Sequence, residues 1–351
     1  MNEFDLRLIP KIEKKGKNYL CIFIKGFFYM NNKRFFWLFI VFMVVIGGVF
    51  VTLALTDCGD GGGGGGGGGG GSGGRGDTST TDPAGTYIIT GSGASFTAKK
   101  DGVTIGTANR PIQDIIDAVQ GHAPASYAIK FGSGSAELDI GEDGFTLTGG
   151  TITLSGKITA SGSLYVVSLQ SGASIISTAD IKHTGYQGGI WNWSTGTITI
   201  SGGTVSATNG TAIRNNSTGA VNITGGTVST TGPDTIAIAV WNQSTGKITV
   251  SGTALVTSEN TDASYGTIYL REGSAAVLEI TGGTVSNTSA DAGIRNAIYN
   301  NSNGNINISG GRVETASTKT PKEFAVNNAG GGVVTIGGGA TIVGVNYGVS
   351  P

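Results

Sequence analysis

The feature that most constrains the fold is a sequence motif that is repeated through the second half of the chain. One form is Ala-Ile-Arg-Asn-Asn-Ser-Thr-Gly, followed by alternating apolar residues and Gly-Gly-Thr-Val-Ser. When the copies are aligned, successive copies lie 23, 23, 27, 28, 30 and 28 residues apart, and one column contains Leu169, Asn192, Asn215, Asn242, Leu270, Asn300 and Asn328. A period of this size is typical of one solenoid turn.

Within each copy the apolar residues alternate with polar ones, which is the periodicity of a strand. Examples are Ile198 and Ile200, Val221 and Ile223, and Ile248 and Val250. A further apolar column follows the glycines of each copy, at Ile181, Val205, Val228, Val285, Val313 and Ile342. The pattern predicts about three short strands per turn. Because no single turn could bury its apolar face alone, the core must come from stacking.

These residues resemble the right-handed parallel β-helix family, the pectate-lyase-like solenoids, over residues 151–351. The resemblance implies an all-β parallel β-helix. It also implies that the asparagine column is a structural ladder, in which amides at a bend bond to the same position in neighbouring turns. The ladder residues are Asn192, Asn215, Asn242, Asn300 and Asn328, and Leu169 and Leu270 interrupt the column.

Residues 83–150 are predicted to cap the first turn. The segment Pro111–Gly121 places Ile112, Ile115, Ile116 and Val119 on one helical face, with proline near the start and glycine at the end. Such an amphipathic helix would cover the open end of a β-helix, which otherwise exposes unpaired backbone.

The N-terminal part of the chain predicts export. Residues 1–34 hold 8 Lys or Arg and 3 Asp or Glu, and residues 35–57 open with 21 uncharged, mostly apolar residues, long enough to cross a bilayer. Positive charge before the span predicts an exported body. Met30 is an alternative start, which would make the segment a signal peptide. The glycine-rich residues 58–82 are predicted to form a flexible linker.

Cys58 ends the segment Leu55–Cys58, which resembles a bacterial lipobox, although Asp57 departs from the usual small residue. The resemblance implies lipidation of Cys58. The alternative is an uncleaved membrane anchor. Both interpretations predict that the residues after the linker are exported and tethered to a membrane, at the outer membrane or the cell surface of a bacterium.

Composition excludes several classes of function. The chain has 63 glycines, 13% charged residues and two histidines, His122 and His183, which lie far apart in the sequence, so a zinc site is not expected. The body carries a net charge of about −6 because residues 1–34 carry +5 of a total of −1, and this balance argues against nucleic-acid binding. We expect no catalytic cofactor. The tripeptide Arg75–Asp77 matches an integrin-binding motif. A chance match is the better explanation in such a glycine-rich tract.

An outward column lies one residue before the ladder. Because the residues before it point inward, a period of two sends its side chains outward. Trp193, two residues further on, adds to it. Aromatic rings and a guanidinium on a rigid face predict binding of a glycan or of a host or cell-surface protein; the alternative is that the rings cover the sheet. The predicted ligand-binding residues are Trp191, Trp193, Arg214, Trp241, Tyr269 and Tyr299.

A second candidate site is an aspartate column. Asp234, Asp262 and Asp291 each precede the ladder position by eight or nine residues, on three successive turns. Enzymes of the β-helix family stack acidic residues in this way, so the resemblance implies possible Ca²⁺ binding or acid–base chemistry. Arg271 and Arg295 are the candidate catalytic cations.

These features predict a membrane-tethered, exported β-helix that acts as an adhesin or carbohydrate-binding protein without catalysis. The alternative is a polysaccharide lyase or glycoside hydrolase that uses the aspartate column.

Overall fold

The computed structural model describes residues 4–8, 12–14, 17–27, 37–45, 85–232, 237–289, 295–315, 323–344 and 347–350. The chain forms two compact units, Met1–Gly76 and Asp77–Pro351. Cys58, the predicted linker 58–82 and the tripeptide Arg75–Asp77 lie outside the described residues.

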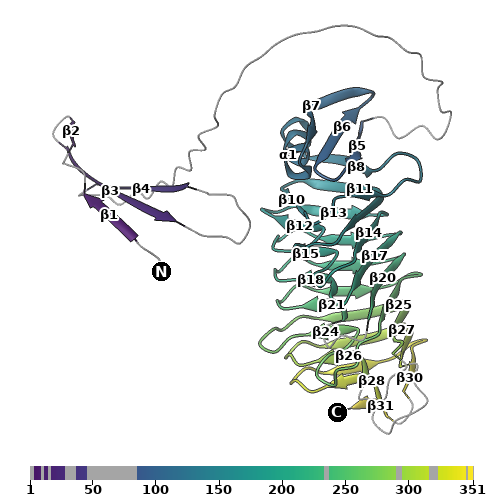
Figure 1. Ribbon diagram of the computed structural model, residues 1–351. Helices are drawn as coiled ribbons and strands as arrows, with labels where there is room; N and C mark the ends of the chain where they lie inside the picture. Colours follow the sequence, from purple (N-terminus) through teal and green to yellow (C-terminus); the bar gives the residue numbers. More distant parts are fainter. Residues whose placement is uncertain are drawn as a thin grey trace, which may run out of the picture. The chain divides into compact units, whose positions relative to one another are not determined.

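The first unit contains an antiparallel sheet of four strands, with β3 pairing with each of the other three (Figure 1). The strands are β1 (Phe4–Leu8), β2 (Ile12–Lys14), β3 (Lys17–Phe27) and β4 (Trp37–Val45). Strand β4 lies inside the segment 35–57 that was predicted to be a signal peptide or membrane anchor. Among the residues that the structure describes, no helix combines the length and the apolar character needed to cross a bilayer.

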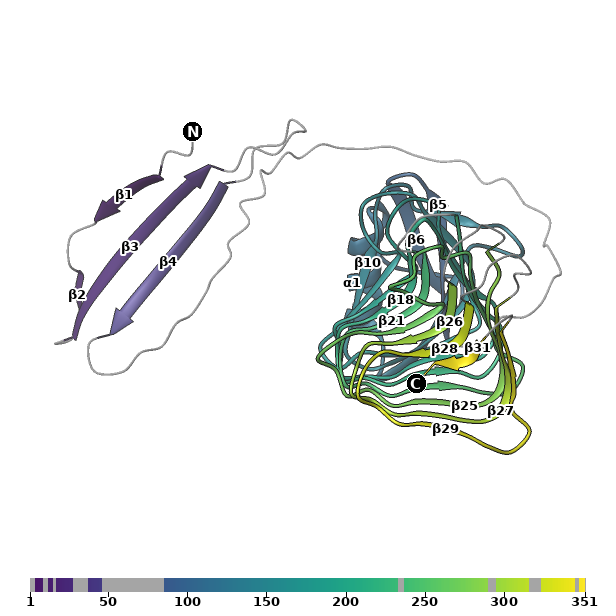
Figure 2. The ribbon, with the colours of Figure 1, turned by 90° about the horizontal axis from the view of Figure 1, so that it is seen from below.

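The second unit is an all-β parallel solenoid of about seven turns, which confirms the repeat architecture predicted from the sequence (Figure 1). Each turn contributes strands to three parallel ladders, seen end-on in Figure 2. The first ladder carries the asparagine column, and we call it the asparagine face. Its strands are β10 (Phe145–Thr148), β12 (Val167–Gln170), β15 (Ile190–Asn192), β18 (Thr211–Asn215), β21 (Ile238–Asn242), β24 (Ile268–Leu270), β26 (Arg295–Asn300), β28 (Glu323–Asn328) and β31 (Tyr347–Ser350).

The second face follows the bend after the asparagine column. Its strands are β8 (Ser126–Phe131), β11 (Thr151–Ala160), β13 (Ser174–Ser177), β16 (Ile198–Ile200), β19 (Val221–Ile223), β22 (Ile248–Val250), β25 (Leu278–Asn287), β27 (Ile306–Thr315) and β29 (Val334–Ile336). Here the predicted alternation holds: Ile198 and Ile200 are fully buried, whereas Thr199 between them is partly exposed. Full burial of each such side chain stabilises the stack by about 1.5–3 kcal/mol.

The third face shares the long strands β11, β25 and β27 with the second and adds β9 (Leu138–Asp139), β14 (Asp180–His183), β17 (Thr204–Thr208), β20 (Thr227–Thr231), β23 (Leu255–Ser258) and β30 (Thr341–Val343). The predicted third apolar column lies in register along it. Glycine is needed at the bend between the second and third faces. At Gly226 φ is +68°, and a Cβ atom there would lie 2.5 Å from the carbonyl oxygen of Gly203.

The start of the solenoid holds the helix that was predicted over residues 111–121. It is α1 (Ile112–His122), and its apolar residues Ile112, Ile115, Ile116 and Val119 are buried in the common core. The helix lies at one end of the stack, beside β5 (Thr86–Ser92), β6 (Ser95–Lys100) and β7 (Val103–Arg110) (Figure 1). These three strands form an antiparallel meander that joins the solenoid through the parallel pair of β5 and β8.

Candidate binding face

The asparagine column forms hydrogen bonds from turn to turn. Asn192 Nδ2 donates to Asn215 Oδ1 at 2.9 Å, and Asn215 Nδ2 donates to Asn242 Oδ1 at 3.1 Å. Beyond Leu270, Asn300 Nδ2 donates to Asn328 Oδ1 at 2.7 Å. These amides form a ladder along the bend, and the ladder holds the neighbouring residues of successive turns at the regular spacing of paired strands, about 4.8 Å.

The residue before each ladder position points outward, as period two requires. In register from turn to turn, this column contains Ser168, Trp191, Arg214, Trp241, Tyr269, Tyr299 and Asn327. Its ring centroids are close: 5.8 Å between Trp241 and Tyr269, and 5.8 Å between Tyr269 and Tyr299. We call the residues from Trp191 to Tyr299 in this column the aromatic row.

Arg214 lies between Trp191 and Trp241 in the aromatic row. Its guanidinium carbon lies 5.4 Å from the ring centroid of Trp191 and 4.8 Å from that of Trp241, so the cation is stacked between two indoles. Arg214 Nη2 donates to Gln243 Oε1 at 3.0 Å, and Nε donates to Asn216 Oδ1 at 3.2 Å. The side chain is therefore held in one orientation between Trp191 and Trp241.

Rings outside the row pack on it. The ring centroid of Tyr165 lies 5.1 Å from that of Trp191, and the ring centroid of Trp193 lies 4.9 Å from that of Trp191. Tyr265 lies 5.0 Å from Tyr269, edge to face. The sequence analysis missed Tyr165 and Tyr265, because both precede their strands in connections of irregular length.

Exposure differs along the row. Tyr269 is only 7% exposed, and Trp191, Trp241 and Tyr299 are partly buried against their neighbours. Trp193, by contrast, is 50% exposed. The stacked rings thus support one another, and Trp193 offers the largest accessible aromatic surface of the row and its flanking residues.

A second row of side chains, most of them polar, runs beside the aromatic row; the sequence analysis named its members Trp193 and Arg271 but did not identify the row. It occupies the first residue after each ladder position, where backbone N–H groups continue the parallel pairing, as from Asn216 to Asn192 at 2.9 Å and from Gln243 to Asn215 at 2.8 Å. We call it the bend row. It contains Trp193, Asn216, Gln243, Arg271 and Asn301. Its amides supply both donors and acceptors.

The hydroxyls of Tyr165 and Tyr269 are neutral donors. Burial raises the pKa of the Tyr165 hydroxyl above its ordinary value, although the Arg214 guanidinium acts in the opposite direction. Burial likewise raises the pKa of Tyr269. The face therefore combines aromatic surface, neutral hydroxyls and amides with a stacked cation.

The predicted aspartate site is described in part. Asp234 and Asp291 lie outside the described residues, and Asp262 lies in the connection between β23 and β24, where its Oδ1 accepts the N–H of Ser264 at 2.7 Å. Arg271 is exposed in the bend row, whereas Arg295 is fully buried. Within the described ranges, no three His, Cys, Asp or Glu side chains lie close enough together to hold a metal ion.

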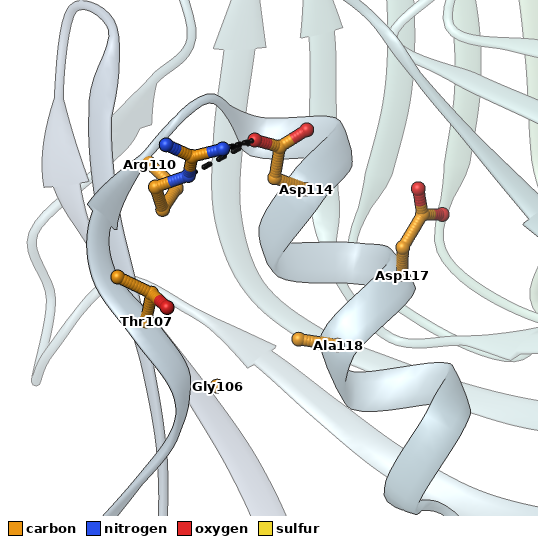
Figure 3. A pocket seen from close by; sticks show the side chains of 6 residues that line it. All are labelled: Gly106, Thr107, Arg110, Asp114, Asp117 and Ala118. Carbon is orange, nitrogen blue, oxygen red and sulfur yellow. Dashed lines mark hydrogen bonds and ion pairs between the residues drawn. The ribbon is translucent and has the colours of Figure 1, made fainter. Parts of the chain in front are cut away.

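A depression lies beside α1, lined by Gly106, Thr107, Arg110, Asp114, Asp117 and Ala118 (Figure 3). Its polar groups already have partners: Arg110 Nη2 lies 2.9 Å from Asp114 Oδ2 in an ion pair, and the neutral amide of Gln113 donates from Nε2 to Asp117 Oδ1 at 2.7 Å. Because these side chains are exposed and satisfied by one another, the depression is a weaker candidate than the asparagine face.

Comparison of the chain with protein family models, with curated proteins and with solved structures finds no significant match.

Proposed function

We propose that this chain is a membrane-tethered, exported surface protein that binds a carbohydrate chain along its asparagine face, without catalysis. One observation carries the proposal: the aromatic row and the bend row run side by side over successive turns. Sugars present apolar C–H surfaces and hydroxyl groups together, and a face of rings flanked by amides complements both.

The geometry favours an extended ligand over a compact one. The rows follow the solenoid axis, with equivalent side chains about 4.8 Å apart. The ladder amides and the stacked Arg214 hold the rows in place before a ligand arrives, which lowers the entropy cost of binding. A linear polysaccharide meets such a surface over several turns.

Trp193 gives the clearest test of this proposal, because its half-exposed ring can be removed without opening the core. We expect Trp193→Ala to weaken binding to immobilised polysaccharides about tenfold, as for an aromatic contact residue. Ile176→Ala is the matched control, since Ile176 is 40% exposed on the second face. Equal binding by both variants and by the unchanged protein would contradict the proposed face, and binding to a protein instead of a glycan would identify an adhesin of a different ligand class.

The tether is tested separately at Cys58. If this residue is lipidated, Cys58→Ser should release the protein from membranes or leave an unprocessed precursor. A variant that fractionates and migrates like the unchanged protein would favour the uncleaved anchor.

A further inference from the structure

The charge pattern of the aromatic row narrows the ligand class. Arg214 is the cation of this row, and its neighbours in register on both sides, Trp191 and Trp241, are neutral rings. Among the described residues, no carboxylate forms an ion pair with Arg214; its partners are two indoles, the side-chain oxygens of Asn216 and Gln243, and the Tyr165 hydroxyl. The row therefore presents an isolated positive charge that no acidic side chain of the described residues neutralises.

The guanidinium is prepared to bind an oxyanion. Of its five N–H donors, Nε and one position of Nη2 bond Asn216 and Gln243, and the Tyr165 hydroxyl takes one more, so two donors remain for a ligand. Stacking between the indoles fixes the plane of the guanidinium, and a planar fork of N–H donors matches a carboxylate in bidentate geometry. Partial burial strengthens such a pair relative to one formed in open solvent.

A uniformly charged chain fits the row poorly. A ligand with a carboxylate on every sugar would place further anions against Trp191 and Trp241, whose faces carry negative partial charge. Removing those carboxylates from water without a cationic partner would cost free energy. One acidic sugar at Arg214, with neutral sugars on either side, satisfies each position of the row.

We propose, on the basis of the carbohydrate-binding function above, that the ligand is a heteropolysaccharide in which acidic sugars are separated by neutral ones, and that Arg214 binds the carboxylate of an acidic sugar. Neutral sugars of the same chain contact Trp191, Trp193 and Trp241. Arg214 would thus determine specificity, and the rings would supply contact area.

The test measures binding of the full chain to gellan, in which glucuronate is separated by neutral sugars, to carboxyl-reduced gellan and to polygalacturonate. We expect native gellan to bind about 10- to 100-fold more tightly than the reduced form, which is the effect of losing a charge-assisted hydrogen bond. Polygalacturonate should bind more weakly than native gellan. Arg214→Gln should abolish the preference for the native form, and Arg214→Lys should restore it only in part, because the ammonium lacks the planar fork.

Lys182→Gln is the control. Lys182 is an exposed cation on β14 of the third face and belongs to neither the aromatic row nor the bend row, so its loss should leave the preference for native gellan intact. Near-ultraviolet circular dichroism of each variant reports whether the tryptophans keep their packing. Equal binding of native and reduced gellan, or a preference unchanged in a folded Arg214→Gln variant, would overturn the acidic-sugar proposal alone. Failure of all three polysaccharides to bind would overturn the proposed function together with it.

Discussion

Replacing Asn215 by alanine should strongly destabilise the solenoid. The fully buried amide accepts from Asn192 at 2.9 Å and donates to the carbonyl oxygen of Gly219 at 2.9 Å and to Asn242 at 3.1 Å. Its removal leaves the Asn192 amide and the Gly219 carbonyl inside the bend without the hydrogen bonds that Asn215 forms with them. Each buried polar group left unsatisfied costs about 1–3 kcal/mol, so the free energy of unfolding should fall by about 2–6 kcal/mol.

Guanidinium unfolding of residues 77–351, the second compact unit, measures this change. Asn192→Ala should cost a similar amount, because it leaves Asn215 Oδ1 and the buried backbone N–H of Ser194 without their partner. The control is Asn222→Ala. Asn222 points outward on the second face, and its expected effect is below about 0.5 kcal/mol. Equal midpoints for Asn215→Ala and Asn222→Ala would refute the ladder as a source of stability.

Two further predictions concern the second and third faces. Burial lowers the pKa of His183 below its ordinary value of 6.5, so only the unfolded state gains a proton as the pH first falls below this value. Thermal stability should therefore decrease from about pH 6.5 downward, and an equal decrease in His183→Gln would contradict this cause. Gly226→Ala should lower the melting temperature more than Gly172→Ala. Both glycines have positive φ, but only at Gly226 would the new methyl group clash with backbone atoms. Equal decreases in melting temperature would contradict the clash.

Much of the fold was predictable because local pattern and register carry the same information in a solenoid. The alternation around Ile198 predicted the inward side chains, and the spacing of Asn192, Asn215 and Asn242 predicted which residues face each other across turns. The helix over residues 111–121 was predictable from its apolar face alone. Each of these features depends on residues close together in the sequence or separated by one period.

The candidate site was less accessible to prediction, for a physical reason. The outward position of Trp241 followed from period two, but its stacking on Arg214 depends on side-chain rotamers that no spacing determines. Tyr265 reaches Tyr269 from a connection whose path is set by tertiary contacts: Asn296 Nδ2, one turn later, donates to the carbonyl oxygens of Ala263 and Tyr265 at 3.0 and 2.8 Å. The amides of the bend row resemble ordinary turn residues until their neighbours are known.

The connections that vary in length are those that lead into the asparagine face. The connection from the asparagine face to the second face keeps nearly one length, as at 193–197, 216–220 and 243–247. The connection from the third face back to the asparagine face grows from 209–210 to 232–237 and 259–267. Strand pairing fixes the outline of each turn, so the added residues of 259–267 form a loop outside the paired strands, and loops are where binding residues concentrate. The longest of these three supplies Tyr265, and the stacking of Tyr265 on Tyr269 shows that such an insertion extends the aromatic surface without altering the ladder beneath it.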